Sequence, residues 1–233
     1  MGEWWAGVRG QFYDSFVDGS LWIQYFKGLG VTVEVSIFAA LIGLVLGTVI
    51  ALMNMSRRRD GKRNAASVIA MVYIDVIRGT PSVIQLLIMW FIILKSCTNG
   101  VLVSVLAFGI NSGAYVAEII RGGIQAVDNG QMEAGRSLGL SKVQTMIYVV
   151  LPQAFKNAFP SLLNEFITLL KETAILGYVG MADLTRVANQ VSARTYEPFM
   201  PLLGAAAIYF VVIKVLSILF GRLERRMREG DQH

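Results

Sequence analysis

Residues Glu133–Pro152 read EAGRSLGLSKVQTMIYVVLP, a partly polar stretch within a strongly apolar chain. Its pattern predicts two short helices in succession. Glu133 lies near the start of the first helix, where the helix dipole favours an anion. Gly139 suits the left-handed residue that commonly ends a helix, and Ser141 with Gln144 has the spacing of a capping box at the start of the second helix. We therefore expect a rigid helical hairpin over residues 130–152.

The surface of this hairpin is expected to be lined by small residues. Ala134 and Gly135 carry little or no side chain, so a partner could approach them closely. A stripe of apolar residues follows on the second helix: Leu140, Val143, Ile147 and Val150. Pro152 suits the first turn of the next helix. These features predict a wedge that docks on another protein.

The composition of the 233-residue chain is that of a membrane protein. Hydrophobic residues make up 55% and charged residues 16%, against about 25% charged residues in an ordinary soluble domain. The net charge of +5 falls in short clusters beside apolar runs, as positive-inside topology predicts, so we do not expect nucleic-acid binding. The single Cys97 allows no internal disulfide, and His233 at the last position is a poor metal ligand.

We predict an all-α transmembrane fold with five spans, because a span needs about 20 mostly apolar residues. We treat residues 1–233 as one transmembrane domain. Pro81 breaks the second span, since proline disfavours helix at the preceding residue. A small-residue stripe in the first span, at Gly43, Gly47 and Ala51, suits either a closely packed helix or lipid. The predicted spans are residues 30–55, 66–94 (broken at 78–81), 101–124, 154–176 and 199–220.

Basic residues set the predicted orientation. Cytoplasmic loops carry the excess of lysine and arginine, and the first loop and the C-terminal tail are the most basic segments. With five spans, the N-terminus then lies outside and the C-terminus in the cytoplasm, so the 130–152 hairpin is cytoplasmic. The basic residues are Arg57, Arg58, Arg59, Lys62 and Arg63 in the loop and Arg222, Arg225, Arg226 and Arg228 in the tail.

The hairpin motif resembles a known family. Glu133-Ala134-Gly135, followed by Gly139, Val149 and Leu151-Pro152, looks like the EAA motif of ABC-importer permeases, with Gly135 and Val149 as mild departures. Further stretches resemble its polar amino-acid branch (histidine, glutamine, glutamate and arginine type): RGTPSVIQLL, NSGAYVAEIIRGGIQAV, QTMIYVVLPQAF, LLKETA and LERRM. The resemblance covers nearly the whole chain and implies a five-span type I ABC-importer permease with a cytoplasmic coupling-helix hairpin.

This resemblance implies a multi-pass permease subunit in a bacterial cytoplasmic membrane, surrounded by lipid. A second permease, identical or related, would pair with it, and an extracytoplasmic binding protein would deliver a polar amino acid. ATP and magnesium would bind to separate ABC ATPase subunits, which the hairpin contacts through Glu133, Ala134, Gly135, Gly139 and Ser141. The chain itself has no phosphate-binding G-x-x-x-x-G-K-[ST] loop and no nucleophile constellation, so we expect no catalysis, cofactor or metal in this chain.

Polar residues within the spans are candidates for the substrate path, because charges in a membrane are costly. Asn111, Ser112, Tyr115 and Glu118 lie on the third span. Glu118 is suited to the substrate's ammonium group, and Asn111 and Ser112 to its carboxylate. Alternatively, Glu118 pairs with Arg121 or with a neighbouring helix.

The fourth span carries a second polar group, at Asn164, Thr168, Lys171 and Glu172. Lys171 and Glu172 are suited either to a gate or to pairing with another segment. We interpret Arg78 as an interface anchor and Lys214 as a contact to the second subunit.

Two other functions compete with an ATP-driven importer. A secondary transporter usually shows internal repeats with paired broken helices, and one break without a repeat is visible here. A membrane-embedded enzyme needs clustered aspartate or histidine at a span end, and the sequence shows no such cluster. The sequence specifies neither the amino acid nor whether the two permeases are identical.

Overall fold

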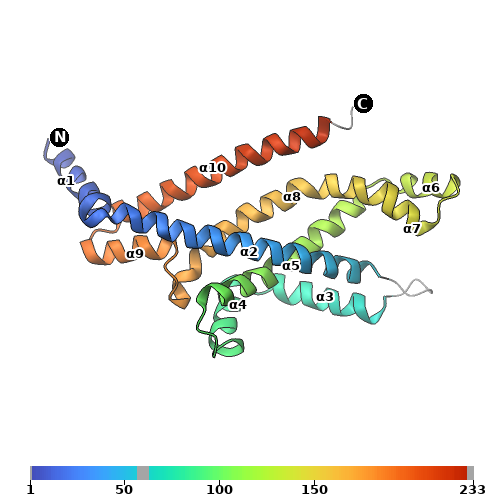
Figure 1. Ribbon diagram of the computed structural model, residues 1–233, viewed down its shortest axis with the longest axis horizontal. Helices are drawn as coiled ribbons and strands as arrows, with labels where there is room; N and C mark the ends of the chain where they lie inside the picture. Colours follow the sequence, from blue (N-terminus) through green and yellow to red (C-terminus); the bar gives the residue numbers. More distant parts are fainter. Residues whose placement is uncertain (1, 57–62, 230–233) are drawn as a thin grey trace. The chain divides into compact units, whose positions relative to one another are not determined.

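The computed structural model of the protein describes residues 2–56 and 63–229. Four cations of the predicted first loop, Arg57, Arg58, Arg59 and Lys62, lie outside the described residues. All secondary-structure elements of the described residues are helical, and Figure 1 shows their order along the chain: α1 (Gly2–Phe12), η1 (Tyr13–Val17), η2 (Asp18–Ser20), α2 (Leu21–Met55), α3 (Ala65–Arg78), α4 (Ser82–Ile88), η3 (Met89–Ile93), α5 (Gly100–Gln125), α6 (Asn129–Ser137), α7 (Lys142–Thr145), η4 (Met146–Val150), α8 (Leu151–Glu172), η5 (Thr173–Val179), α9 (Leu184–Thr195) and α10 (Phe199–Glu229).

Three described stretches are long and apolar enough to cross a membrane: Gly7–Met55, Gly100–Gln125 and Phe199–Met227. They correspond to the first, third and fifth predicted spans. The first is longer than predicted because the chain is helical from its N-terminal segment onward and α2 already begins at Leu21.

The predicted break in the second span is present. α3 and the α4–η3 segment together are apolar enough to span, and they bend by 105° between Arg78 and Ser82. Gly79 caps α3, and its N–H donates to the Asp75 carbonyl at 2.9 Å. Pro81 follows, and it lacks the N–H that would continue the helix. Counting this pair as one span gives up to four spans by length and composition.

The fourth predicted span, residues 154–176, corresponds to α8 and the start of η5. α8 has 22 residues and contains Pro160, but it is not among the helices that meet the apolar criterion, because Lys156, Glu165 and Lys171 lie within it. Its crossing of a membrane stays a prediction, and α8 needs protein or water rather than lipid along its polar side.

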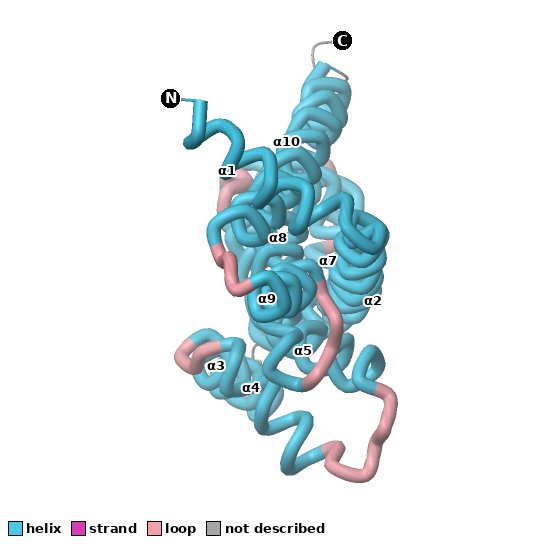
Figure 2. Tube along the Cα trace, turned by 90° about the vertical axis from the view of Figure 1, so that its left-hand side faces the viewer, coloured by secondary structure: helices cyan, strands magenta, loops and turns pink. Residues whose placement is uncertain are grey.

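The chain divides into two compact units, each built from segments far apart in sequence. The first contains Met1–Ala39, Ser82–Phe108 and Thr168–Leu216. Its core forms where α9 packs on the first turns of α2 and on α10, and Figure 2 views it from the end at which α9 faces the reader. The buried residues of this core are Leu21, Tyr25, Leu184, Val187, Ala188, Val191 and Ala205.

The second unit contains Ala40–Pro81, Gly109–Ile167 and Ser217–His233. In it α2 packs closely on α5. A Cβ added at Gly43 would lie 2.9 Å from the Cβ of Ser112, and one at Gly47 would lie 2.6 Å from the Cβ of Val116. The small-residue stripe therefore contacts a helix rather than lipid, as the first of the two sequence interpretations expected.

Candidate functional site

The predicted hairpin is present as α6 and α7, which lie side by side beyond the start of α8 (Figure 1). Asp128 caps α6 by accepting from the Gly130 N–H at 2.6 Å. The helix ends at Ser137 with Leu138 as its C-cap, and Gly139 follows with a φ of +86°, which confirms the predicted left-handed position. The Gly139 N–H donates to the Arg136 carbonyl at 3.0 Å.

The capping box of α7 is also confirmed. The Gln144 N–H donates to the Ser141 hydroxyl at 3.3 Å, and the Ser141 N–H donates to the Gln144 side-chain carbonyl at 2.9 Å. The Thr145 hydroxyl donates to the Ser141 carbonyl at 3.0 Å. The ends of the two short helices are thus fixed by hydrogen bonds between residues a few positions apart in the sequence. These bonds hold the hairpin in one conformation.

One expectation about the hairpin surface is wrong. Ala134 is exposed, but Gly135 is buried, and a Cβ there would collide with the Thr145 side chain. The reason is that α6 and α7 cross at Gly135, so its missing side chain serves the contact within the hairpin rather than a contact to a partner. A Cβ at Gly139, in contrast, would meet nothing within 4 Å.

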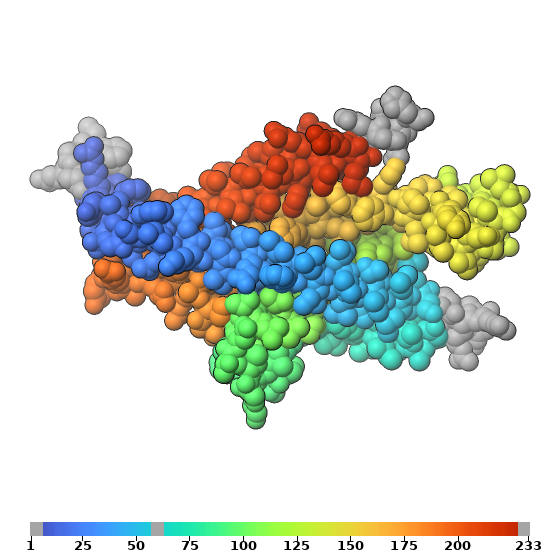
Figure 3. Space-filling view, viewed as in Figure 1, coloured from blue at the N-terminus to red at the C-terminus, as the bar shows by residue number. Residues whose placement is uncertain are grey.

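Large apolar side chains lie on the outside of the hairpin. Leu138 is 84% exposed, Tyr148 71% and Val143 66%, and Glu133 is exposed as well. In Figure 3 the hairpin is the yellow-green segment. The predicted apolar stripe divides, because Val150 is buried with Val127 and Ala154. Large apolar side chains that are exposed outside the predicted spans are candidates for an interaction site.

A second candidate site is a charged cluster beside the broken span. Two nitrogens of Arg121 donate to the two carboxylate oxygens of Glu118, each at 2.8 Å. Arg78 reaches the same carboxylate at 3.4 Å, and its guanidinium lies 5.3 Å from the centre of the Tyr115 ring. We call these four residues the arginine cluster.

The arginine cluster favours one of the two interpretations of Glu118. The Glu118 carboxylate is paired with two arginines and its side chain is 22% exposed. Glu118 therefore forms ion pairs within the protein rather than offering an open acceptor to an ammonium group. The cluster holds two cations and one anion and therefore carries a net positive charge. Arg78 is 42% exposed at its side chain and has five N–H donors, which suits a carboxylate ligand.

The other predicted path residues lie on α5 and α8. Asn111 and Ser112 are buried, and the Ser112 hydroxyl donates to a Glu165 carboxylate oxygen at 2.9 Å. On α8, Asn164, Thr168 and Lys171 are exposed and share one face by their spacing, and Glu172 is half-buried. Among the described residues, no three His, Cys, Asp or Glu side chains gather as a metal site requires.

The sequence does not place Arg78 or Glu165 in this site. It predicts Arg78 as an interface anchor, because nothing in the local sequence shows that the break turns it toward Glu118. The spacing of Glu118 and Arg121, three residues apart on a helix, was the available signal for their ion pair.

Residues 43–229 match the family described as binding-protein-dependent transport system inner membrane component. The chain is 40% identical over 204 residues to a putative glutamine transport system permease protein of Rickettsia conorii, covering 86% of this chain and 91% of that protein. It is 40% identical over 208 residues to an arginine transport system permease protein of Bacillus subtilis, covering 88% and 93%.

A solved structure is similar at the level of sequence and fold. The crystal structure of an amino acid ABC transporter with histidines includes a chain that is 44% identical, with a TM-score of 0.82, over 91% of this chain and 98% of that chain. The all-helical architecture is thus that of a type I ABC-importer permease. The chain belongs to the family of binding-protein-dependent transport system inner membrane components and is a non-catalytic permease subunit.

Proposed function

We propose that the chain is the transmembrane subunit of an ATP-driven ABC importer that carries a polar amino acid. The relatives are named for glutamine and arginine, and the solved relative is an amino acid transporter. A second permease, identical or related, completes the translocation path, and an extracytoplasmic binding protein supplies the substrate. ATP and magnesium bind to the separate ATPase subunits.

The observation that carries this proposal is the hairpin with its exposed apolar surface. The hairpin is fixed by its own caps, so a force applied to it moves it as one body. Leu138, Val143 and Tyr148 are largely exposed, and they supply the apolar contact that a docking wedge needs. Glu133 and Ala134 on α6 complete the contact surface, whereas Gly135 acts by packing within the hairpin.

The substrate path is proposed to run along the polar faces of α5 and α8, with Arg78 as a contact for the substrate carboxylate. Guanidinium groups bind carboxylates in a two-pronged geometry, and Arg78 lies at the corner where the second span breaks. Tyr115 positions Arg78 through its ring, while Glu118 and Arg121 hold one another.

The proposed orientation places the N-terminus outside and the hairpin and C-terminus in the cytoplasm. Support comes from the basic residues of the first loop and of the C-terminal tail, because lysine and arginine are enriched in cytoplasmic loops. On this orientation the η5–α9 segment, between α8 and α10, faces the extracytoplasmic side.

Leu138→Asp tests the coupling role. The side chain is 84% exposed, so the substitution leaves the fold intact while placing a charge in the proposed contact. We expect recovery of the ATPase subunit with the tagged permease to fall at least about tenfold, because one lost apolar anchor is worth roughly 1.5–3 kcal/mol, and uptake to fall with it.

Asn129→Asp is the matched control. It adds the same charge to the hairpin, at the exposed start of α6, where the helix dipole tolerates an anion. Full ATPase recovery and full uptake with Leu138→Asp would show that the hairpin does not couple the two subunits.

A further inference from the structure

The most apolar parts of α2 and α10 each carry a single charged residue. Glu34 is the only one within residues 28–55, and Lys214 is the only one within residues 199–221. Both side chains are exposed. In the part of the chain that the structure describes, neither of them has an ion pair or a hydrogen bond. Charges at membrane depth are costly and are usually paired or face a wet cavity, so each of these two needs a partner.

Lys214 lies too deep in α10 for its ammonium group to reach water along the helix. It stands eight positions before Arg222, the first charge of the tail, and fifteen positions after Phe199 at the start of α10. At 1.5 Å per residue these separations are about 12 and 22 Å, and both exceed the length of a lysine side chain. Only 6% of the most apolar part of α10 is buried, against 67% for α5. The described part of the chain therefore does not cover Lys214.

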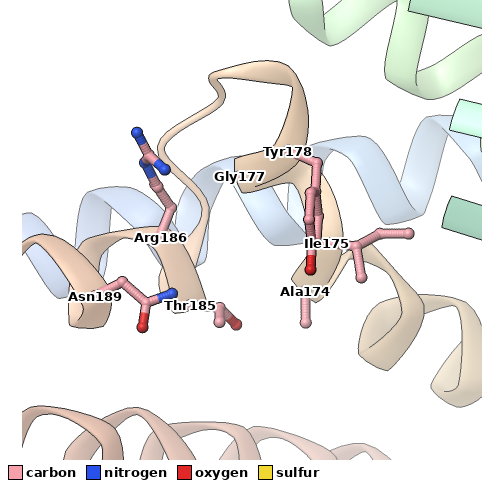
Figure 4. Close-up of a pocket in the computed structure, with 7 residues that line it drawn as sticks. All are labelled: Ala174, Ile175, Gly177, Tyr178, Thr185, Arg186 and Asn189. Carbon is pink, nitrogen blue, oxygen red and sulfur yellow. The ribbon is translucent and has the colours of Figure 1, made fainter. Parts of the chain in front are cut away.

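The start of α9 shows which parts of α2 and α10 lie at the same level. The Leu184 N–H donates to the Thr32 hydroxyl of α2 at 3.3 Å. The Thr185 hydroxyl, which Figure 4 shows on α9, lies 3.4 Å from the Tyr209 hydroxyl of α10. Because these contacts come from two successive residues of α9, Thr32 and Tyr209 lie at about the same level.

Glu34 and Lys214 lie at nearly the same depth as well. Arg194, near the end of α9, pairs with Asp18 just before α2 at 3.5 Å, and α10 begins soon after α9 ends. Both helices therefore run from the end of α9 toward its start. Glu34 lies two residues, about 3 Å, beyond the α9 contact on α2, and Lys214 lies five residues, about 7.5 Å, beyond the one on α10. The difference of about 4–5 Å is within the reach of the two side chains.

Each charge lies on an exposed apolar face of its helix. Phe38 follows Glu34 by one turn, and Phe210 precedes Lys214 by one turn, so each phenylalanine shares the face of its charge. Both rings are exposed. Lipid can cover the rings but supplies no opposite charge in the apolar core, whereas a protein face of matching pattern supplies both.

We propose that Glu34 of one permease pairs with Lys214 of a second copy of the chain, so that these faces of α2 and α10 form the interface between the two copies. A two-fold interface is self-complementary: where one residue contacts another, the reverse contact is also made. A two-fold axis along the membrane normal preserves depth, so the acid on α2 and the base on α10 give two identical ion pairs. The proposal rests on the proposed function for the membrane setting and for the second permease.

Cross-linking between two differently tagged copies tests the contact. In a Cys97→Ser background, one copy carries Glu34→Cys and the other Lys214→Cys, and both are expressed with the ATPase subunits. A membrane-permeant bifunctional thiol reagent should give a product that carries both tags. In the control, Lys27→Cys replaces Glu34→Cys, because Lys27 is exposed on the same face of α2. It lies about 10 Å away along the helix, so we expect at least about fivefold less product.

Charge reversal tests whether the two residues attract each other. Glu34→Lys or Lys214→Glu alone places like charges opposite each other at both pairs. Recovery of the second tagged copy should then fall at least about tenfold, because repulsion is strong where the dielectric constant is low. The double variant should restore recovery to within about threefold of the unsubstituted chain. Lys27→Glu should leave recovery unchanged, and recovery of the ATPase subunit shows that each variant is folded.

Equal cross-linking from Glu34→Cys and Lys27→Cys would overturn the interface, and so would a double reversal that recovers no more of the second copy than the single ones. Restoration of Lys214→Glu by Asp75→Lys, at an exposed acid of α3, would assign the lysine to a different partner and overturn it as well. The proposed function fails by another readout, the unchanged ATPase recovery and uptake of Leu138→Asp, so the two failures are distinguishable.

Discussion

The hairpin and the α2–α5 contact both depend on glycines, but for different reasons: one glycine permits a backbone turn and the other permits close packing of two helices. In the hairpin, Gly139 takes a left-handed φ in open space, and hydrogen bonds close within a few residues of it. Between α2 and α5, Gly47 has ordinary helical geometry and is needed because Val116, far away in the sequence, occupies the space. The hairpin is stabilised by its own local hydrogen bonds, so its apolar side chains can stay exposed for a partner. In the α2–α5 contact, the facing surfaces of the two helices are buried against each other.

The largest expected effect is at the α2–α5 contact, and a second glycine of α2 supplies the control. Gly47→Leu forces a side chain into Val116 and the Gly113 carbonyl, so we expect a loss of about 3 kcal/mol in the free energy of unfolding from overpacking. Gly30→Leu is the control, since a Cβ there meets nothing within 4 Å and leucine is the better helix former. Thermal unfolding of the detergent-solubilised protein measures both. Equal destabilisation by the two substitutions would mean that the α2–α5 contact is not as close as described.

A smaller effect is expected in the arginine cluster, where tertiary contacts join charges rather than small residues. Glu118→Gln leaves two arginines uncompensated, and we expect a loss of about 1–2 kcal/mol in stability, near the lower end for charged hydrogen bonds because all three side chains are partly exposed.

A double-mutant cycle with Arg121→Gln separates the two roles of Glu118. If the pair is structural, the combined loss is smaller than the sum of the single losses, and the double variant keeps measurable uptake. Additive losses of stability together with abolished uptake in both Glu118 variants would return Glu118 to the role of substrate ligand.

The smallest expected effect lies in the hairpin and is local. Ser141→Ala removes the side chain that accepts from the Gln144 N–H, which costs about 1 kcal/mol for a helix cap. We expect faster hydrogen exchange at the α7 amides and an almost unchanged midpoint of global unfolding, because the hairpin opens without the helix contacts. Ser137→Ala, at an exposed residue of the same hairpin, is the control. A fall in the global midpoint equal to that of Gly47→Leu would show that the hairpin and the α2–α5 contact unfold together.

Local patterns accounted for most of the correct predictions. The capping box at Ser141, the left-handed Gly139 and the break at Pro81 each depend on a few neighbouring residues and on backbone chemistry. The apolar runs of α2, α5 and α10 were found by length and hydropathy. α8 is harder to assign as a span from the sequence. Its polar residues are tolerated in a membrane only where protein or water lies beside them, and the composition of the helix does not specify what packs there.

The sequence alone determined that this chain is helical, apolar and interrupted by a capped polar hairpin, because caps, turns and hydropathy act over short distances. Tertiary structure decided which side of each helix is covered. It buried Gly135 beneath Thr145, turned Arg78 at the broken span onto Glu118, and joined Arg194 of α9 to Asp18. Those outcomes depend on contacts between residues far apart in the chain, and the spacing of residues within one helix does not specify them.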